Sequence, residues 1–205
     1  MNKRARRESE KENLRNFILE AAIKIIADEG YDKLTMRRIA KVIGYTPTTL
    51  YLYYKDKEQI LEDIVREVYR KIIVNVAEVV RENKHTPIDK QLELAFKSFI
   101  DTMVSNAEMS RAVIRSGSKA MFREVSIGEP FEENEIPSLY EMLLEGQRQL
   151  IFRKLDDNVS RMLVASILGF AMNAVDNQLH LNSDWDKQTD VYVEILINGL
   201  RMVCK

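Results

Sequence analysis

The sequence contains a single cysteine, Cys204, among 205 residues. One cysteine allows neither a disulfide within the chain nor a cysteine metal cluster, which favours a reducing compartment. Turn residues are also scarce, with 7 glycines and 4 prolines, whereas a β-sandwich needs many of them. With 45% hydrophobic and 31% charged residues, the composition predicts an all-α protein.

Long hydrophobic runs are missing as well. The longest weakly polar stretch, from Met162 to Met172, is far shorter than the roughly 20 residues that a membrane span needs. The first residues, MNKRARRESEKEN, are charged and lack the apolar segment of a secretory signal. We therefore expect a cytoplasmic protein that does not bind a membrane.

The chain has almost no net charge, at −1, but its charges are unevenly distributed. Residues 1–57 hold 13 basic and 8 acidic side chains and carry a net +5, which leaves −6 on the rest. A basic head on an acidic body indicates that only the head meets a polyanion such as DNA.

Short helices separated by glycines are predicted in the head. Residues 14–29 repeat apolar side chains at helical spacing and are followed by Gly30. Thr35 can cap a second helix over 36–43, which Gly44 ends. Thr46-Pro47 then has the pattern of an N-cap followed by proline in the first helical position, which predicts a third helix.

A long helix is predicted to follow the head, because Asp56 and Gln59 form a capping-box pattern and apolar residues recur to Val79. Further helices are expected at 87–106, 107–123, 135–151, 156–181 and 185–204. We predict an N-terminal three-helix helix-turn-helix head, residues 1–57, joined by the long helix to a helical effector-binding and dimerisation body, residues 58–205.

Two short helices around a glycine-containing turn form a helix-turn-helix pattern, whose second helix enters the major groove of DNA. Thr48 and Thr49 are early enough in that helix to touch a base edge. Tyr51, Tyr53 and Tyr54 cannot all point one way, so we expect Tyr54 in the core and the other two near phosphates. Packing of all three within the head is the alternative.

Residues 14–65 resemble the DNA-binding region of TetR-type (tetracycline-repressor-like) transcriptional regulators. The matching features are Ile18 with Ala21-Ala22, Gly30-Tyr31, Thr35, Ile39-Ala40, Gly44, Leu50-Tyr51 and Tyr54-Lys55-Asp56-Lys57-Glu58. The resemblance implies a homodimer that binds a palindromic operator in double-stranded DNA, usually as a repressor, and is released by a small-molecule effector. It places DNA contacts at Thr35, Arg37, Thr46, Thr48, Thr49, Tyr51, Tyr53 and Lys57. Pro47 and Thr48 depart from the usual pattern, which leaves the base preference unreadable.

The body offers candidate residues for two further roles. An apolar or amphipathic effector would contact Phe99, Met103, Arg115, Gln147, Met172, Asn173 and Asp176, although most of the apolar ones equally suit an ordinary core. Small and apolar residues predict close helix packing at Ala165, Gly169, Leu196, Gly199, Leu200 and Val203. The resemblance implies that these last two helices form the dimer interface, and an intramolecular helix pair would use the same residues.

Other functions have weaker support in the sequence. No nucleophile, acid-base or cofactor motif accompanies the isolated Ser116-x-x-Lys119 spacing, so we expect no enzyme and no cofactor. His85 and His180 lack ligand partners at metal-binding spacing, so no metal site is expected. Control by a protein partner, or DNA binding without a small-molecule ligand, is the alternative to an effector-responsive regulator. The basic arm before residue 12 suits either DNA contact or a frayed, solvated terminus.

Overall fold

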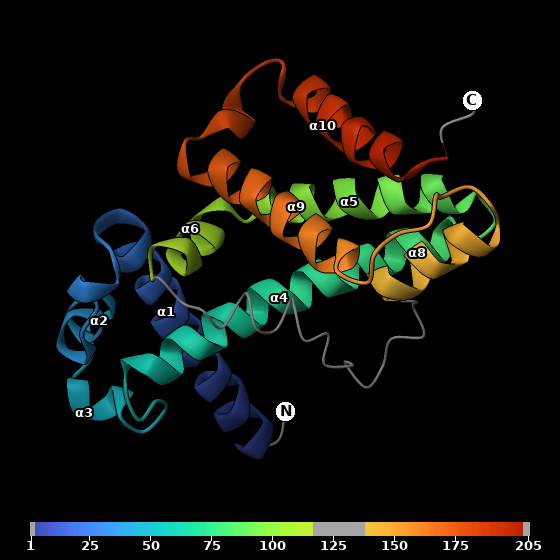
Figure 1. The fold of residues 1–205 in the computed structure, drawn as a ribbon. Helices are drawn as coiled ribbons and strands as arrows, with labels where there is room; N and C mark the ends of the chain where they lie inside the picture. The colour runs from blue at the N-terminus through green and yellow to red at the C-terminus, as the bar shows by residue number, and fades with distance from the viewer. Residues whose placement is uncertain (1–2, 117–137, 203–205) are drawn as a thin grey trace. The chain divides into compact units, whose positions relative to one another are not determined.

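The computed structural model describes residues 3–116 and 138–202, and the regular elements in these ranges are helices (Figure 1). Packing divides the chain into two compact units. Within the described residues, the first unit comprises 3–68 and 108–116, and the second comprises 69–107 and 138–202. The all-α fold predicted from composition is confirmed.

The first unit begins with α1 (Lys3–Glu29), which starts well before residue 14, where the predicted helix began. Residues 9–13 are exposed, so the early part of α1 lacked the apolar repeat that marks the later part. Gly30 ends the helix with a φ of +89°, a conformation that favours glycine. A short 3₁₀ turn, η1 (Tyr31–Lys33), leads from it to the next helix.

Helix α2 (Met36–Ile43) has the predicted bounds and both predicted caps. The Thr35 hydroxyl accepts a hydrogen bond from the backbone N–H of Arg38, at 3.1 Å. Gly44 ends the helix in the left-handed conformation, with φ +74°. The predicted turn between the two helices is therefore confirmed, and α3 (Pro47–Leu50) follows after Tyr45 and Thr46.

Helix α4 (Lys57–Glu82) begins with a variant of the predicted capping box. Asp56 Oδ1 accepts from the backbone N–H of Gln59 at 2.8 Å, as expected. The side chain of Gln59 returns to the backbone N–H of Lys55, at 2.8 Å, and not to that of Asp56. Two backbone donors at this helix start are satisfied in either arrangement.

The first unit is held together by apolar side chains from all its helices. Its fully buried members include Ile18, Ile26, Leu34, Ile39, Leu50, Tyr54 and Ile60. Ile64, Val65 and Val68 of α4 are also buried, and the compact units divide between Val68 and Tyr69. Helix α6 (Ala107–Arg115) is grouped almost entirely with this unit. The functional division into 1–57 and 58–205 stays a prediction, because compactness and function need not share a boundary.

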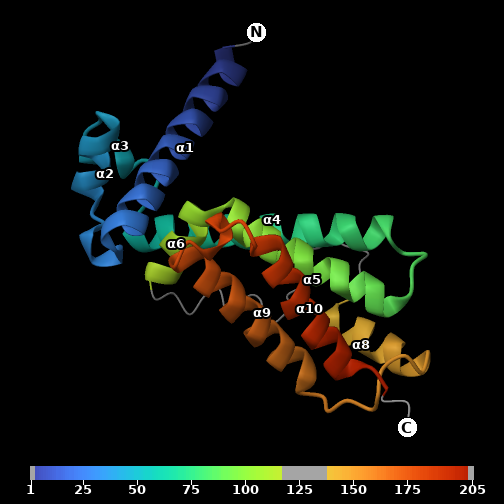
Figure 2. The same ribbon diagram turned by 90° about the horizontal axis from the view of Figure 1, so that it is seen from above.

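The second unit is built around α5 (Ile88–Ser105), which packs against three other helices. These are α8 (Leu139–Arg148), α9 (Val159–Asp176) and α10 (Trp185–Leu200), and Figure 2 shows them around α5. A 3₁₀ turn, η2 (Leu179–Leu181), separates α9 from α10. Each of these helices lies within its predicted range, although the single helix predicted at 156–181 is divided into α9 and η2. The predicted ranges 107–123, 135–151 and 185–204 extend into residues outside the described part.

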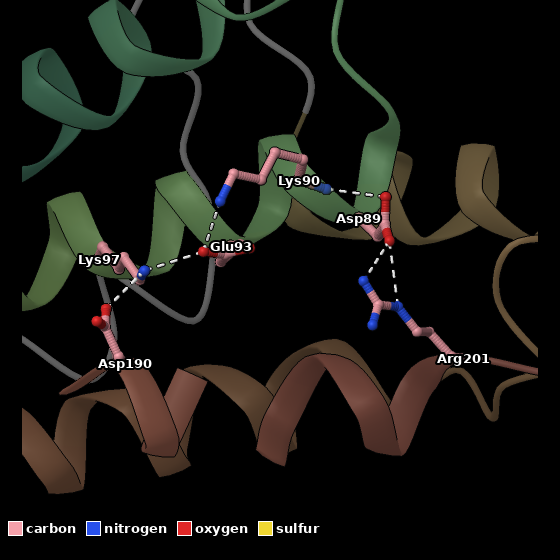
Figure 3. Close-up of polar contacts among 6 residues, drawn as sticks. All are labelled: Asp89, Lys90, Glu93, Lys97, Asp190 and Arg201. Atoms are coloured by element: carbon pink, nitrogen blue, oxygen red, sulfur yellow. Dashed lines mark hydrogen bonds and ion pairs between the residues drawn. The ribbon is translucent and has the colours of Figure 1, made fainter. Parts of the chain in front are cut away.

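Ion pairs connect α5 with α10 (Figure 3). Lys97 Nζ lies 2.9 Å from Glu93 Oε1 and 2.7 Å from Asp190 Oδ1, so one ammonium joins both helices. Arg201, just after α10, donates from Nη2 to Asp89 Oδ2 at 2.6 Å. Burial acts to raise the pKa of Glu93, but hydrogen bonds from Lys90 and Lys97 outweigh it and lower that pKa. Networks of this kind contribute more than isolated surface pairs.

Helix α9 is apolar enough to be considered as a membrane span. Within the described residues it is the one helix that passes on length and composition, with a mean hydropathy of 1.3. A single such helix is weak support for a membrane protein, because core helices of soluble proteins pass as well. Here α9 packs against α5, and Leu163, Ile167 and Leu168 are buried there.

Candidate nucleic-acid interface

The start of α3 is fixed by two threonines. The Thr46 hydroxyl accepts from the backbone N–H of Thr49 at 3.3 Å and lies 3.0 Å from the Thr49 hydroxyl. Pro47 occupies the first turn, where its missing N–H removes no helical hydrogen bond. Leu50 is fully buried and anchors one face of this short helix. Thr48, on the helix surface, is exposed and can meet a ligand.

The eight predicted DNA contacts all keep some exposure to solvent. Thr35, Arg37, Thr46, Thr48 and Tyr51 are exposed, while Thr49, Tyr53 and Lys57 are partly exposed. They come from the first turn of α2, from α3 with its following turn, and from the start of α4. Their DNA contacts stay predictions.

Tyr54 is buried, as expected, and is the phenol that anchors the motif. It is 1% exposed, and its hydroxyl accepts a hydrogen bond from Arg15 Nε at 3.0 Å. Arg15 is also hydrogen bonded to Asp63, so the side chain ties α1 to the turn after α3 and to α4. Burial raises the pKa of Tyr54 to about 12, against the opposing effect of the Arg15 hydrogen bond. Tyr51, by contrast, is 56% exposed.

A second tyrosine, Tyr31 of η1, contacts the first two residues of α4. Lys57 Nζ is 4.1 Å from the centre of its ring, within cation–π range. The Tyr31 hydroxyl donates to Glu58 Oε1 at 3.2 Å. Burial raises the pKa of Tyr31 to about 12, and the Glu58 carboxylate acts in the same direction. The phenol therefore stays neutral at physiological pH and contacts both charged residues.

Three exposed apolar side chains near the motif were not among the predicted contacts. They are Val42, Tyr45 and Leu52, with exposed fractions of 58%, 47% and 76%. Tyr45 follows the glycine of the turn, and Leu52 follows Tyr51. A tyrosine in the turn between two helices could have identified Tyr45 as a candidate contact from the sequence. Leu52 has no polar group, so its residue type was no reason to select it.

A family model described as "Bacterial regulatory proteins, tetR family" matches residues 18–64. This range covers residues 18–29 of α1, both helices of the motif and the start of α4. Residues 18–64 of this chain therefore form a tetR-family regulatory region. The proteins that this model describes are bacterial regulators, and the matched region contains their helix-turn-helix.

Proteins similar to this chain differ in how much of it they match. The fatty acid metabolism regulator protein of Bacillus subtilis (strain 168) is 35% identical over 82 residues, 40% of this chain and 42% of its own. The match thus spans less than half of that relative. Nucleoid occlusion factor SlmA of Aliivibrio fischeri (strain MJ11) is 25% identical over 160 residues, 77% of each chain.

The body also has the fold of solved regulators. The structure of the fatty acid degradation regulator FadR from Bacillus halodurans superposes with a TM-score of 0.68 and 19% identity. The superposition covers 92% of this chain and 97% of that one. At this identity the likeness shows the fold alone, and it extends over both compact units.

The seven predicted effector contacts have different surroundings. Phe99 and Met103 are buried in α5, Met172 is half-buried, and Asn173 and Asp176 are exposed on α9. Gln147 accepts at Oε1 from the backbone N–H of Leu155, at 3.0 Å. Asn173 Oδ1 accepts from Asn177 at 2.7 Å. Arg115 lies in α6, in the first unit. Gln147 and Asn173 each have a local hydrogen-bond partner, and the role of all seven residues as effector contacts stays a prediction.

The predicted dimer contacts lie on α9 and α10, apart from Val203, which falls outside the described residues. Ala165, Gly169 and Gly199 are exposed, Leu196 is partly exposed and Leu200 is buried within the protomer. A Cβ built on Gly169 or Gly199 would meet no atom within 4 Å. Packing inside the protomer therefore does not require glycine at either position.

Proposed function

We propose that this TetR-family protein is a homodimeric repressor that binds a palindromic operator and is released by a small apolar or amphipathic effector. The observation that carries this proposal is the capped α2–α3 motif, which leaves Arg37, Thr48 and Tyr51 exposed while Leu50 and Tyr54 anchor it. The proposed repressor acts in the cytoplasm, which contains the DNA that it binds.

Within the motif, the side chains divide by chemistry. Thr48 is exposed in α3, and its hydroxyl and methyl suit a base edge or a thymine methyl in the major groove. Arg37 and Lys57 supply positive charge for phosphates, and Tyr51 supplies a phenol donor. Phosphate contacts fix the register of the head on DNA, so specificity rests on few side chains near Thr48.

Dimerisation is supported by exposed small and apolar residues on α9 and α10. Met162 and Ile195 are 67% and 64% exposed, and Val191 is also exposed. Gly169 and Gly199 are open to solvent, so a second helix could approach closely there. A twofold dimer presents two identical heads, and a protein of that symmetry binds a palindrome.

Fatty acids or their derivatives are the first effectors to consider. Two proteins similar to this chain carry fatty acid metabolism or degradation in their names. The second unit supplies apolar side chains such as Phe99, Met103 and Met142 for an alkyl chain. An effector releases DNA only if it binds the released state more tightly, with couplings of about 1 to 3 kcal/mol.

The experiment that tests operator binding selects bound duplexes from a random pool at about 0.15 M salt, where nonspecific phosphate contacts are weakened. Enrichment of a palindrome would support a dimeric, sequence-specific regulator. A folded protein that enriches no sequence would contradict the proposal once mass spectrometry of the denatured protein excludes a copurified effector.

The effector is tested separately on the selected operator. Saturated fatty acids of increasing chain length and their thioesters are added to the complex, with short-chain acids as the control. Release that strengthens with chain length supports an apolar effector. Retention of DNA in the presence of every compound, with no binding to the free protein, would contradict fatty-acid control and favour regulation by a protein partner.

A further inference from the structure

We propose that Tyr31 is a positioning residue for DNA binding, which holds the Lys57 ammonium in place for a phosphate and keeps the Glu58 carboxylate away from it. This inference rests on the proposed function, because it assigns Lys57 to the DNA interface. It concerns a residue in the 3₁₀ turn η1, outside the two helices of the motif.

The first contact is between Lys57 and the face of the ring. Lys57 Nζ lies 4.1 Å from the ring centre of Tyr31, and both side chains are partly exposed. A lysine side chain has four rotatable bonds, and ordering it on a phosphate costs conformational entropy. The ring restricts the ammonium before DNA arrives, so less of that cost remains at binding.

The second contact is between Tyr31 and the neighbouring acid. Its hydroxyl donates to Glu58 Oε1 at 3.2 Å. Glu58 directly follows Lys57 in the first turn of α4, so an unrestrained carboxylate there would repel a phosphate and compete for the ammonium. Because one phenol contacts the ammonium through its face and the carboxylate through its hydroxyl, the two charges are held by different parts of the same side chain.

The two contacts are separable by substitution. Tyr31→Phe keeps the ring face and removes the hydroxyl, whereas Tyr31→Leu removes both contacts. Tyr31 is only partly buried, so neither change opens a cavity in the core. We expect Tyr31→Leu to weaken operator binding about three- to tenfold, the range that follows from immobilising one flexible side chain. Tyr31→Phe should weaken it by about twofold or less.

A direct readout in the free protein is the NMR shift of the Lys57 ε-methylene protons. A ring face within cation–π distance moves these protons upfield. We expect the upfield shift in the wild type and in Tyr31→Phe, and its loss in Tyr31→Leu. A Lys57 signal at the same position in the wild type and in Tyr31→Leu would overturn the inference without any DNA measurement.

The functional readout is a double-mutant cycle with Lys57→Ala at about 0.15 M salt. We expect Tyr31→Leu to have no further effect when Lys57 is already alanine, because its effect acts through that ammonium. Equal weakening by Tyr31→Leu in both backgrounds would overturn the inference, and it would assign the loss to a structural role. Any general destabilisation by the leucine is present in both backgrounds and cancels.

Failure of the proposed function has a different signature. If the wild type binds a palindrome no better than a scrambled duplex, operator recognition fails. The cycle is then run on the scrambled duplex at low salt, since phosphate contacts do not depend on sequence. A cycle that is additive on a palindrome bound with high specificity overturns the role of Tyr31 alone.

Discussion

Arg15 Nε donates a hydrogen bond to the hydroxyl of Tyr54 over 3.0 Å, and this buried phenol anchors the turn between α3 and α4. The contact joins residues 39 positions apart and fixes the end of the recognition motif to α1. Because the same guanidinium is bonded to Asp63, the motif is held by one side chain to two longer helices.

Tyr54 should make the protein less stable at alkaline pH. Its pKa in the folded protein is about 12, above the usual 10.0, so in the unfolded chain the phenol ionises first. Its contribution to the free energy of unfolding is complete below pH of about 10 and is lost as pH rises towards about 12. Urea unfolding of the wild type and Tyr54→Phe across this range checks the slope.

We expect the slope to be smaller in Tyr54→Phe but not zero, because Tyr31, with a pKa of about 12, contributes in the same direction. Tyr51→Phe is the matched control for the loss of a phenol hydroxyl, since Tyr51 is exposed. If the free energy of unfolding falls with pH at the same rate in Tyr54→Phe and the wild type, Tyr54 does not contribute to the loss of stability at alkaline pH.

The cap of α3 gives a prediction about the motif itself. Thr46→Ala removes the oxygen that accepts from Thr49, which should lower the free energy of unfolding by about 1 kcal/mol. Thr46→Ser keeps an acceptor and should retain most of that stability. Both are measured by urea unfolding. Equal stability of Thr46→Ala and the wild type would show that the cap does not stabilise the head.

Gly146 should be intolerant of even one methyl group. A Cβ at this position would lie 2.0 Å from Phe152 Cδ2, and Phe152 is 2% exposed, so a buried ring would have to shift. We expect Gly146→Ala to cost about 1 to 3 kcal/mol of unfolding free energy. Gly169→Ala and Gly199→Ala are the controls, because neither meets an atom within 4 Å. A neutral Gly146→Ala would contradict the close packing of Phe152.

A substitution at Gly199 tests whether α10 forms the dimer interface. Gly199 is exposed and a Cβ there would meet no atom within 4 Å, so we expect the Gly199→Leu subunit to fold normally. The larger side chain should separate helices that pack closely across a dimer interface. We expect light scattering to show a shift from dimer towards monomer. Glu78→Leu, exposed on α4, is the control. A Gly199→Leu protein that stays dimeric at the same concentrations would exclude this position from the interface.

Sequence reasoning predicted the head better than the body, for a physical reason. Thr35, Gly44 and Thr46 act on backbone groups within a few positions, so their roles were readable from local pattern and are confirmed as caps. The early start of α1 was missed because residues 9–13 are exposed and show no apolar repeat.

Contacts between distant positions were not readable in this way. Nothing in the sequence pairs Arg15 with Tyr54 or Tyr31 with Lys57, because side-chain geometry in the folded head sets both distances. In the body, Phe99 and Met103 suit a core and an effector site equally, since both environments favour apolar side chains. Gln147 accepts a hydrogen bond from the backbone N–H of Leu155, a contact that the sequence does not reveal, and its predicted effector contact stays a prediction.

The proposed function depends on sequence-specific recognition of DNA by the α2–α3 motif of a dimer. Its most direct test is the ratio of two dissociation constants at about 0.15 M salt, one for the selected palindrome and one for a scrambled duplex of equal length. We predict a ratio of at least about 10³, as for specific DNA-binding proteins. A ratio near one, measured on a folded and effector-free dimer, would contradict the account.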